Sequence, residues 1–180
     1  MTMLRQGLLE DRAVTLGGGV TPAVRHALAA LGARVEELDA GLDEGGAREW
    51  ASGAGAVSAL VYDARDAFGA GGQDALRDTL ERAWVAVRAL ATGALIPAGA
   101  GKVVLIGPRP DAGTLATAVR SALENLARTL SVEWARYGVG TVAIAPGPQT
   151  PDGDLAELVC FLVSPAGEYF TGCVFELGLA

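Results

Sequence analysis

A chain of 180 residues has the length of one domain with a substantial core, and we expect a single domain over residues 1–180. Hydrophobic residues make up 51% of the chain, yet no apolar run is long enough to span a bilayer and no secretory signal is evident at the N-terminus. The net charge of −7 argues against nucleic acid or an anionic membrane as a partner. Cys160 and Cys173 form no ligand motif and are expected to be free thiols, which favours a cytoplasmic location.

Short β-branched runs alternate with helical patterns along the chain, and this alternation is typical of a parallel α/β sheet. Strands are predicted at 12–16, 34–38, 57–62, 102–106, 141–145 and 173–177. Helices are predicted at 21–31, 47–52, 73–90, 115–137 and 154–162. Thr21 is the expected N-cap of the first helix, and residues 66–72 are expected to form a glycine-rich loop.

The C-terminal third carries the most specific motifs. Residues 131–147 read SVEWARYGVGTVAIAPG, and residues 155–177 read LAELVCFLVSPAGEYFTGCVFEL, with Thr171-Gly172 before the last strand. Both segments resemble the short-chain dehydrogenase/reductase family. The resemblance implies a three-layer, Rossmann-like α/β fold with a parallel sheet of about six strands. It also implies that one family strand and the helical substrate lid are missing, because residues 40–56 and 148–153 leave little room for them.

The glycines after the first predicted strand match the family's phosphate loop, with one residue fewer. The resemblance makes Gly17, Gly18 and Gly19 candidates for backbone contact with a cofactor pyrophosphate. Asp39 follows the second strand, where many members bind the adenosine ribose, and such an acid favours NAD. The alternative for the glycines is a tight strand-to-helix turn that binds no phosphate. The alternative for Asp39 is an acid that stands there by chance in an acidic segment.

The motif that forms a floor of the family's cofactor site is Asn-Asn-Ala-Gly, and residues 62–65 read YDAR here. Arg65 therefore brings volume and charge to a place where backbone lies close to the cofactor. Either the dinucleotide is excluded or Arg65 turns outward, so the cofactor is expected to be none or NAD.

The family's four catalytic positions are all replaced. By the resemblance, Thr79 takes the place of the asparagine, Pro108 of the serine, Ala116 of the tyrosine and Arg120 of the lysine. The chemistry needs a hydroxyl whose pKa is lowered by a neighbouring cation, and neither alanine nor proline provides one. The resemblance therefore implies a catalytically degenerate member with no catalytic residue to name.

Other polar residues give weaker indications. Arg65, Arg109 and Arg120 could converge at the carboxyl ends of the strands and form a pocket for an anionic metabolite, the alternative being solvated surface arginines. His26 is the only histidine and is expected to be a surface residue of the first helix. One histidine and two distant cysteines predict no metal site.

Family members commonly assemble through the two long helices and the last helix and strand, here 73–90, 115–137 and 154–177. The aromatic residues of these segments could lie at an interface or in the core: Trp84, Trp134, Phe161, Tyr169 and Phe175. Three functions stay open. The chain is an inactive homologue that works as a homo-oligomer or beside an active family subunit, an NAD(H)-dependent oxidoreductase with a rearranged or partner-completed site, or a sensor of a small anion.

Overall fold

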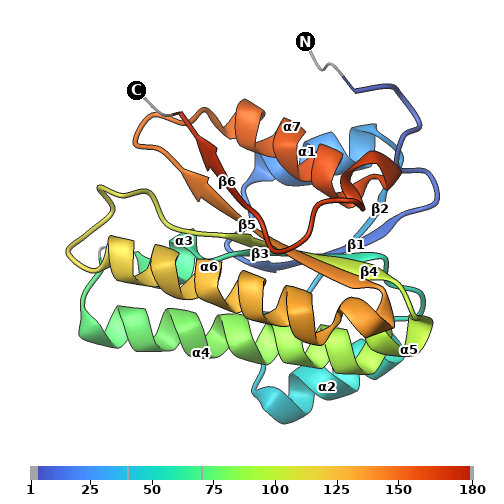
Figure 1. Ribbon diagram of the computed structural model, residues 1–180, viewed down its shortest axis with the longest axis horizontal. Coiled ribbons are helices and arrows are strands. Elements are labelled where there is room, and N and C mark those ends of the chain that lie inside the picture. The colour runs from blue at the N-terminus through green and yellow to red at the C-terminus, as the bar shows by residue number, and fades with distance from the viewer. Residues whose placement is uncertain (1–3, 40, 70, 179–180) are drawn as a thin grey trace.

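The computed structural model describes residues 4–39, 41–69 and 71–178, and its centre is a sheet of six parallel strands (Figure 1). The strands are β1 (Ala13–Gly18), β2 (Arg34–Glu37), β3 (Ala59–Asp63), β4 (Gly101–Ile106), β5 (Val139–Pro146) and β6 (Val174–Leu177). They lie in the order β2-β1-β3-β4-β5-β6. The predicted α/β fold with a parallel sheet of about six strands is confirmed.

Helices cover both faces of this sheet (Figure 1). On one face α1 (Pro22–Ala30) packs against α7 (Asp152–Val163), and on the other α4 (Gln73–Leu90) packs between α2 (Glu44–Gly53) and α6 (Ala116–Glu133). Each face has its own core, because strand side chains alternate between the two sides. The three layers expected of a Rossmann-like fold are therefore present.

The strand order reverses direction at β1. After β2 the chain crosses β1 and forms β3 on its other side, and the register pairs Gly18 of β1 with Asp63 of β3. Open parallel sheets bind ligands in the crevice that such a reversal leaves at the carboxyl ends of the strands. The glycines of β1 and the residues after β3 thus come together at the place where a site is expected.

Several predicted boundaries are wrong in an informative way. β1 continues through Gly17 and Gly18, because both pair with β3. A short helix, α3 (Arg65–Phe68), occupies the start of the predicted loop. After α4 the chain forms a π-helical turn (Ala91–Leu95) and the short α5 (Ile96–Ala98), and after α6 a 3₁₀ turn (Ala135–Tyr137).

Thr21 takes the predicted N-cap position of α1, directly before Pro22, but its side chain does not cap the helix. The Thr21 hydroxyl makes no capping hydrogen bond and is buried without a partner. The amide of Val24 instead donates to the backbone carbonyl of Thr21, over 3.1 Å. Trp134, one of the aromatic candidates for an interface, packs in the core beneath α6.

The connection from β5 to α7 consists of residues 147–151, and no helix lies in it. The Thr150 hydroxyl accepts a hydrogen bond from the Gly147 amide (2.8 Å) and donates one to the Leu177 carbonyl (3.0 Å). This clamp fastens the connection to β6. Within the described residues, no helix is both long and apolar enough to cross a bilayer.

Candidate functional site at the carboxyl ends of the strands

The glycine segment is packed against β3 rather than held open. Gly17 lies inside β1 beneath the Tyr62 ring, and Gly18 has a φ of +74° that favours glycine. A Cβ at Gly18 would collide with the Asp63 carbonyl, and the Gly19 amide already donates to that carbonyl over 3.1 Å. Pro22 at the start of α1 has no amide hydrogen to offer. Neither Gly19 nor Pro22 therefore leaves a backbone donor free for a pyrophosphate.

A hollow of about 430 Å³ lies beside this segment, and Gly18, Gly19 and Asp39 all line it. The predicted binding residues are thus brought together, with the exception of Gly17. Glu37 and Asp66 line the same hollow. Glu37 is paired with Arg25, whereas Asp66 forms no ion pair among the described residues.

Asp66 is the most unfavourable of these carboxylates for a phosphate. Its side chain stands directly over Gly19, so that a Cβ at that glycine would collide with the carboxylate. Like charges a few ångströms apart repel by about 1 kcal/mol even at the dielectric constant of water, and by more near a protein surface. The hollow therefore disfavours an anion where the family binds pyrophosphate.

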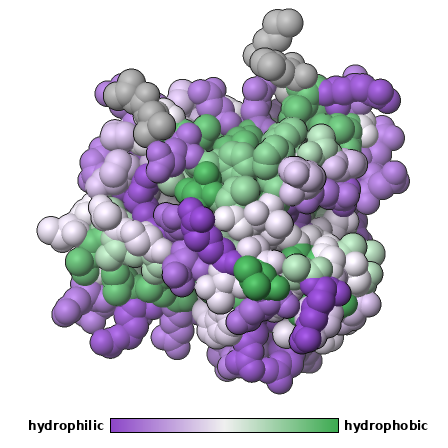
Figure 2. Space-filling model, in the orientation of Figure 1, coloured by the Kyte–Doolittle hydropathy of each residue, from purple (hydrophilic) through white to green (hydrophobic). Residues whose placement is uncertain are grey.

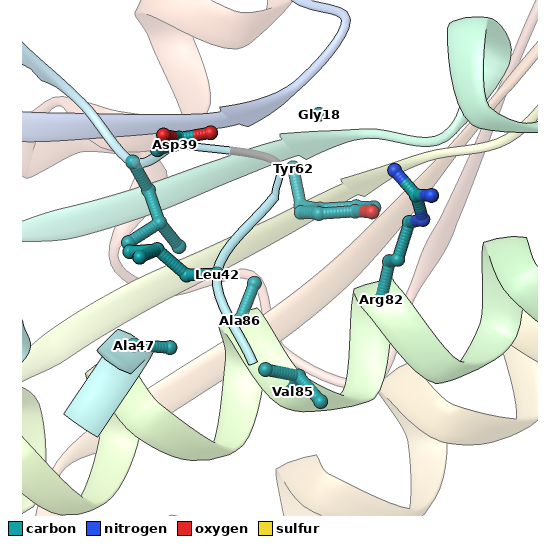
Figure 3. Close-up of a pocket in the computed structure, with 9 residues that line it drawn as sticks. Gly18, Asp39, Leu42, Ala47, Tyr62, Arg82, Val85 and Ala86 are labelled. Carbon is teal, nitrogen blue, oxygen red and sulfur yellow. The ribbon is translucent and has the colours of Figure 1, made fainter. Parts of the chain in front are cut away.

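Next to this hollow lies a pocket between β3 and α4 (Figure 3). Tyr62 and Arg82 reach into it from opposite elements, and Leu42 and Ala86 close it. Its volume of about 20 Å³ is room for about one water molecule. Burial raises the pKa of Tyr62 to about 12, so this phenol keeps its proton at neutral pH and cannot replace the family's activated tyrosine.

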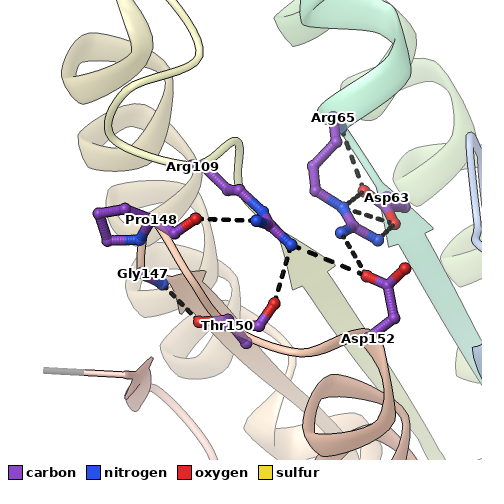
Figure 4. A network of polar contacts seen from close by, with 7 residues as sticks. All are labelled: Asp63, Arg65, Arg109, Gly147, Pro148, Thr150 and Asp152. Carbon is purple, nitrogen blue, oxygen red and sulfur yellow. Dashed lines mark hydrogen bonds and ion pairs between the residues drawn. The ribbon is translucent and has the colours of Figure 1, made fainter.

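Arg65 closes the floor of the crevice (Figure 4). Its Nε and Nη2 donate to the carboxylate of Asp63 over 2.9 and 2.6 Å, and its Nη1 lies 3.4 Å from Asp152 at the start of α7. Burial lowers the pKa of this guanidinium, but the hydrogen bonds and charge of Asp63 raise it on balance. Of the two expected alternatives, the outward turn of Arg65 is not what the structure shows: the side chain lies inward, over β3.

Arg109 completes this network. Its guanidinium donates to the carbonyls of Pro148 and Thr150, each over 2.8 Å, and lies 4.0 Å from Asp152 (Figure 4). Two of the three arginines that could converge, Arg65 and Arg109, do meet here, but on a carboxylate of the protein itself. The positive charge that an anionic ligand would need is already balanced by Asp63 and Asp152.

The four positions of the catalytic set offer no proton-transfer group. Ala116 and Pro108 are buried, and the Thr79 hydroxyl is buried without a hydrogen-bond partner. Arg120 donates to the carbonyls of Pro108 (2.9 Å) and Pro146 (2.6 Å), so it joins the ends of β4 and β5 instead of facing a reacting group. Burial lowers the pKa of this guanidinium, against the opposing charge of Glu176.

His26 is exposed on α1, as predicted, and both cysteines are free thiols. Among the described residues, no group of three or more potential ligands could hold a metal ion. Asp66 and Asp152 are the residues that sequence reasoning missed. In the sequence, Asp66 is recognisable only as an acid soon after a strand, and Asp152 only as an acid at the start of a helix. The residues that they lie against, Gly19 and Arg65, are far away in the sequence.

Comparison with known proteins supports the same lineage. The chain is 29% identical over 118 residues to a galactitol 2-dehydrogenase (L-tagatose-forming) of Cereibacter sphaeroides, covering 47% of this chain and 46% of that protein. It therefore spans about half the length of the curated relative it matches. No known protein-family model matches the chain.

Solved structures share the fold. A citronellol catabolism dehydrogenase of Pseudomonas aeruginosa has a TM-score of 0.78 at 20% identity, with 97% of this chain and 96% of the other covered. A short-chain dehydrogenase/reductase of Serratia marcescens carrying two substitutions has a TM-score of 0.75 at 21% identity, covering 96% of each chain. The chain therefore has the fold of these short-chain dehydrogenases/reductases.

A third solved relative is a putative NAD(P)-dependent gluconate 5-dehydrogenase of Beutenbergia cavernae with bound NADP, with a TM-score of 0.75 at 22% identity over 96% and 97% of the chains. In our chain the crevice does not fit a dinucleotide in the family's manner. Asp66 stands over Gly19, the pocket between β3 and α4 admits about one water, and Arg65 lies across the floor.

Proposed function

We propose that this chain is a non-catalytic short-chain dehydrogenase/reductase homologue that acts through assembly, as a homo-oligomer or beside an active family subunit. The observation that carries this proposal is the inward position of Arg65, whose ion pairs with Asp63 and Asp152 occupy the floor of the old cofactor crevice. The loss of the tyrosine at Ala116 and the engagement of Arg120 with two carbonyls support it independently.

The distribution of exposed apolar side chains favours assembly. Among the described residues, the large hydrophobic side chains that are exposed are Trp84 (41%), Val132 (77%) and Tyr169 (90%). They belong to α4, to α6 and to the segment between α7 and β6, the elements through which family members commonly pair. Exposed apolar side chains of this kind are typical of interaction surfaces when they gather.

The surface over α7 adds to this pattern. Hydrophobic side chains gather on the upper part of the face seen in Figure 2, where α7 lies. Leu158 and Phe161 of α7 are only partly buried, as are Phe170 and Phe175, and the rings of the last two are 5.5 Å apart. A second protein surface packed here would remove apolar area from water, at about 25 cal/mol per Å². We also propose that the protein works in a reducing compartment, the cytoplasm, where its free thiols persist.

Calorimetric titration with NADH and with NADPH, together with sedimentation analysis, tests the proposal. We expect no binding heat from either cofactor over a range of temperatures, and a species heavier than one chain. Tyr169→Ser and Val132→Asp should shift the sedimenting species toward the monomer. His26→Gln, a change at an exposed residue of α1, should not. A monomer at all concentrations, both alone and with a co-purified family subunit, would refute assembly.

An NAD(H)-dependent oxidoreductase is the second candidate, because Gly18, Gly19 and Asp39 still line one hollow. This function requires Arg65 to leave Asp63, or a partner to supply the missing acid. Micromolar binding of either cofactor in the same titration would favour it. The third candidate, a sensor of a small anion, has weaker support, since the donors of Arg65, Arg109 and Arg120 already bind groups of the protein.

A further inference from the structure

The only lysine of the chain is buried. Lys102 lies near the start of β4, at the opposite end of the sheet from the crevice, and is 3% exposed. Its ammonium donates to the carbonyl of Phe170 and lies 3.5 Å from the carbonyl of Glu168. Burial lowers the pKa of Lys102 to about 8, although the charge of Glu168 opposes the change. A buried cation that meets carbonyls but no direct carboxylate partner is costly and calls for a further explanation.

Lys102 lines a hollow of about 330 Å³ at this amino end of the sheet, together with Arg12, Ser58 and Glu168. Gly140 lies beside the amine, because a Cβ at this position would come within 3.3 Å of the Lys102 nitrogen. The hollow is therefore polar at one wall and large enough for a molecule of several heavy atoms.

The charges at this wall do not cancel. Arg12 and Lys102 carry two positive charges and Glu168 one negative charge, so the hollow holds one net positive charge in a chain of net charge −7. Arg12 is paired with Glu168 through one of its nitrogens and has further N–H groups. The Ser58 oxygen accepts from the Ala13 amide over 3.1 Å, which leaves its own proton free to be donated.

We propose that this hollow binds a small monocarboxylate, with its carboxylate between Arg12 and Lys102 and its short aliphatic body against Val57 and Val163. A single negative charge matches the net charge of the wall, whereas a phosphate dianion would exceed it and would face Glu168. The two valines line the same hollow and give an aliphatic body an apolar surface. This site is separate from the crevice, so it does not depend on the proposed non-catalytic role.

The single lysine gives a direct test. Protein grown on lysine labelled with ¹³C at Cε gives one labelled Cε signal. Its chemical shift can be followed while sodium butyrate is added at constant ionic strength. We expect a saturable shift with a dissociation constant on the order of 1 mM, and no such shift with butyramide, which has the shape without the charge. A shift that grows without saturation, or that sodium chloride reproduces, would overturn the proposal. Phosphate binding as tightly as butyrate would overturn the choice of a carboxylate.

Two variants that keep the lysine make the test sharper. Arg12→Gln should weaken butyrate binding at least tenfold, because a charged hydrogen-bond donor is lost. Glu168→Gln should strengthen it severalfold, because the competing carboxylate is removed while the backbone carbonyl near Lys102 stays. Unchanged thermal midpoints would show that both proteins remain folded. Equal affinities in the wild type and both variants would contradict the site.

Discussion

Arg65 donates from its Nε and its Nη2 to the carboxylate of Asp63, the residue two places before it, and so buries an ion pair at the end of β3. The Asp63 carboxylate is inaccessible to solvent and the Arg65 side chain is only 15% exposed. The carboxylate depends on the guanidinium, because no water reaches Asp63 to replace its partner. The pair therefore stabilises the present shape of the crevice as well as filling it.

Removing the arginine should expose this dependence. Arg65→Ala leaves the Asp63 carboxylate buried without its bidentate partner, and we expect a loss of about 3 kcal/mol in the free energy of unfolding. Burial raises the pKa of Asp63, so the loss should be smaller in mild acid, where the carboxyl group takes up a proton. Urea unfolding at two pH values measures both effects.

The double variant Asp63→Ala/Arg65→Ala is the matched control for that experiment. With both charges gone, much of the lost stability should return, because no unpaired charge remains in the interior. If the double variant were less stable than Arg65→Ala, the pair would not be the source of the effect.

Introducing the family's catalytic tyrosine and lysine at positions 116 and 120 should not produce an active site. Ala116 is fully buried at the start of α6, so Ala116→Tyr must displace neighbouring side chains and should cost about 2 kcal/mol. Adding Arg120→Lys removes the fork that joins the Pro108 and Pro146 carbonyls. Thermal unfolding and a carbonyl-reduction assay with NADH would check both points, and turnover by the double variant would contradict the reading of this site.

The titration of Tyr62 should be visible as an effect of pH on stability. The folded-state pKa of about 12 lies above the ordinary value of 10.0, because burial disfavours the phenolate. The native state therefore keeps a proton that the unfolded state loses between these values. The resulting stability is fully present below pH 10 and declines as the pH rises toward 12. Tyr62→Phe should lack this decline, and a variant with the same pH profile as the wild type would disprove it.

Chemical labelling of amines should report how well Lys102 is protected in the folded protein. Lys102 is the only lysine of the chain, and its ammonium is held by the carbonyl of Phe170. We expect acylating reagents to modify Lys102 far more slowly in native protein than in protein unfolded by urea. Mass spectrometry after trypsin digestion measures both rates. Equal rates in the two states would show that the amine is unprotected.

Local patterns predicted the elements whose own sequence determines them. The helix predicted at 73–90 has those bounds, since the spacing of its hydrophobic residues lies within the helix itself. The π-helical turn after α4 and the extension of β1 through its glycines were not predictable in this way. Gly17 and Gly18 are strand residues because β3 lies beside them.

The same distinction holds for the site. The family resemblance predicted that Arg65 would disturb the cofactor crevice, because it replaces a glycine of the family motif. It gave no indication of Asp152, which lies 87 residues further along the chain and shares its carboxylate between two arginines. Contacts between the ends of separate strands depend on the folded sheet, and no spacing within the sequence records them.

The Thr150 clamp has a consequence for protein engineering. Because its hydroxyl joins the Gly147 amide to the Leu177 carbonyl, the connection after β5 and the final strand form one fastened unit. A Cβ at Gly147 would also collide with the Leu177 carbonyl, so the turn packs closely against the end of β6. Grafting a longer loop here would release the end of β6 along with it, and such grafts should be attempted only with a second fastening for that strand.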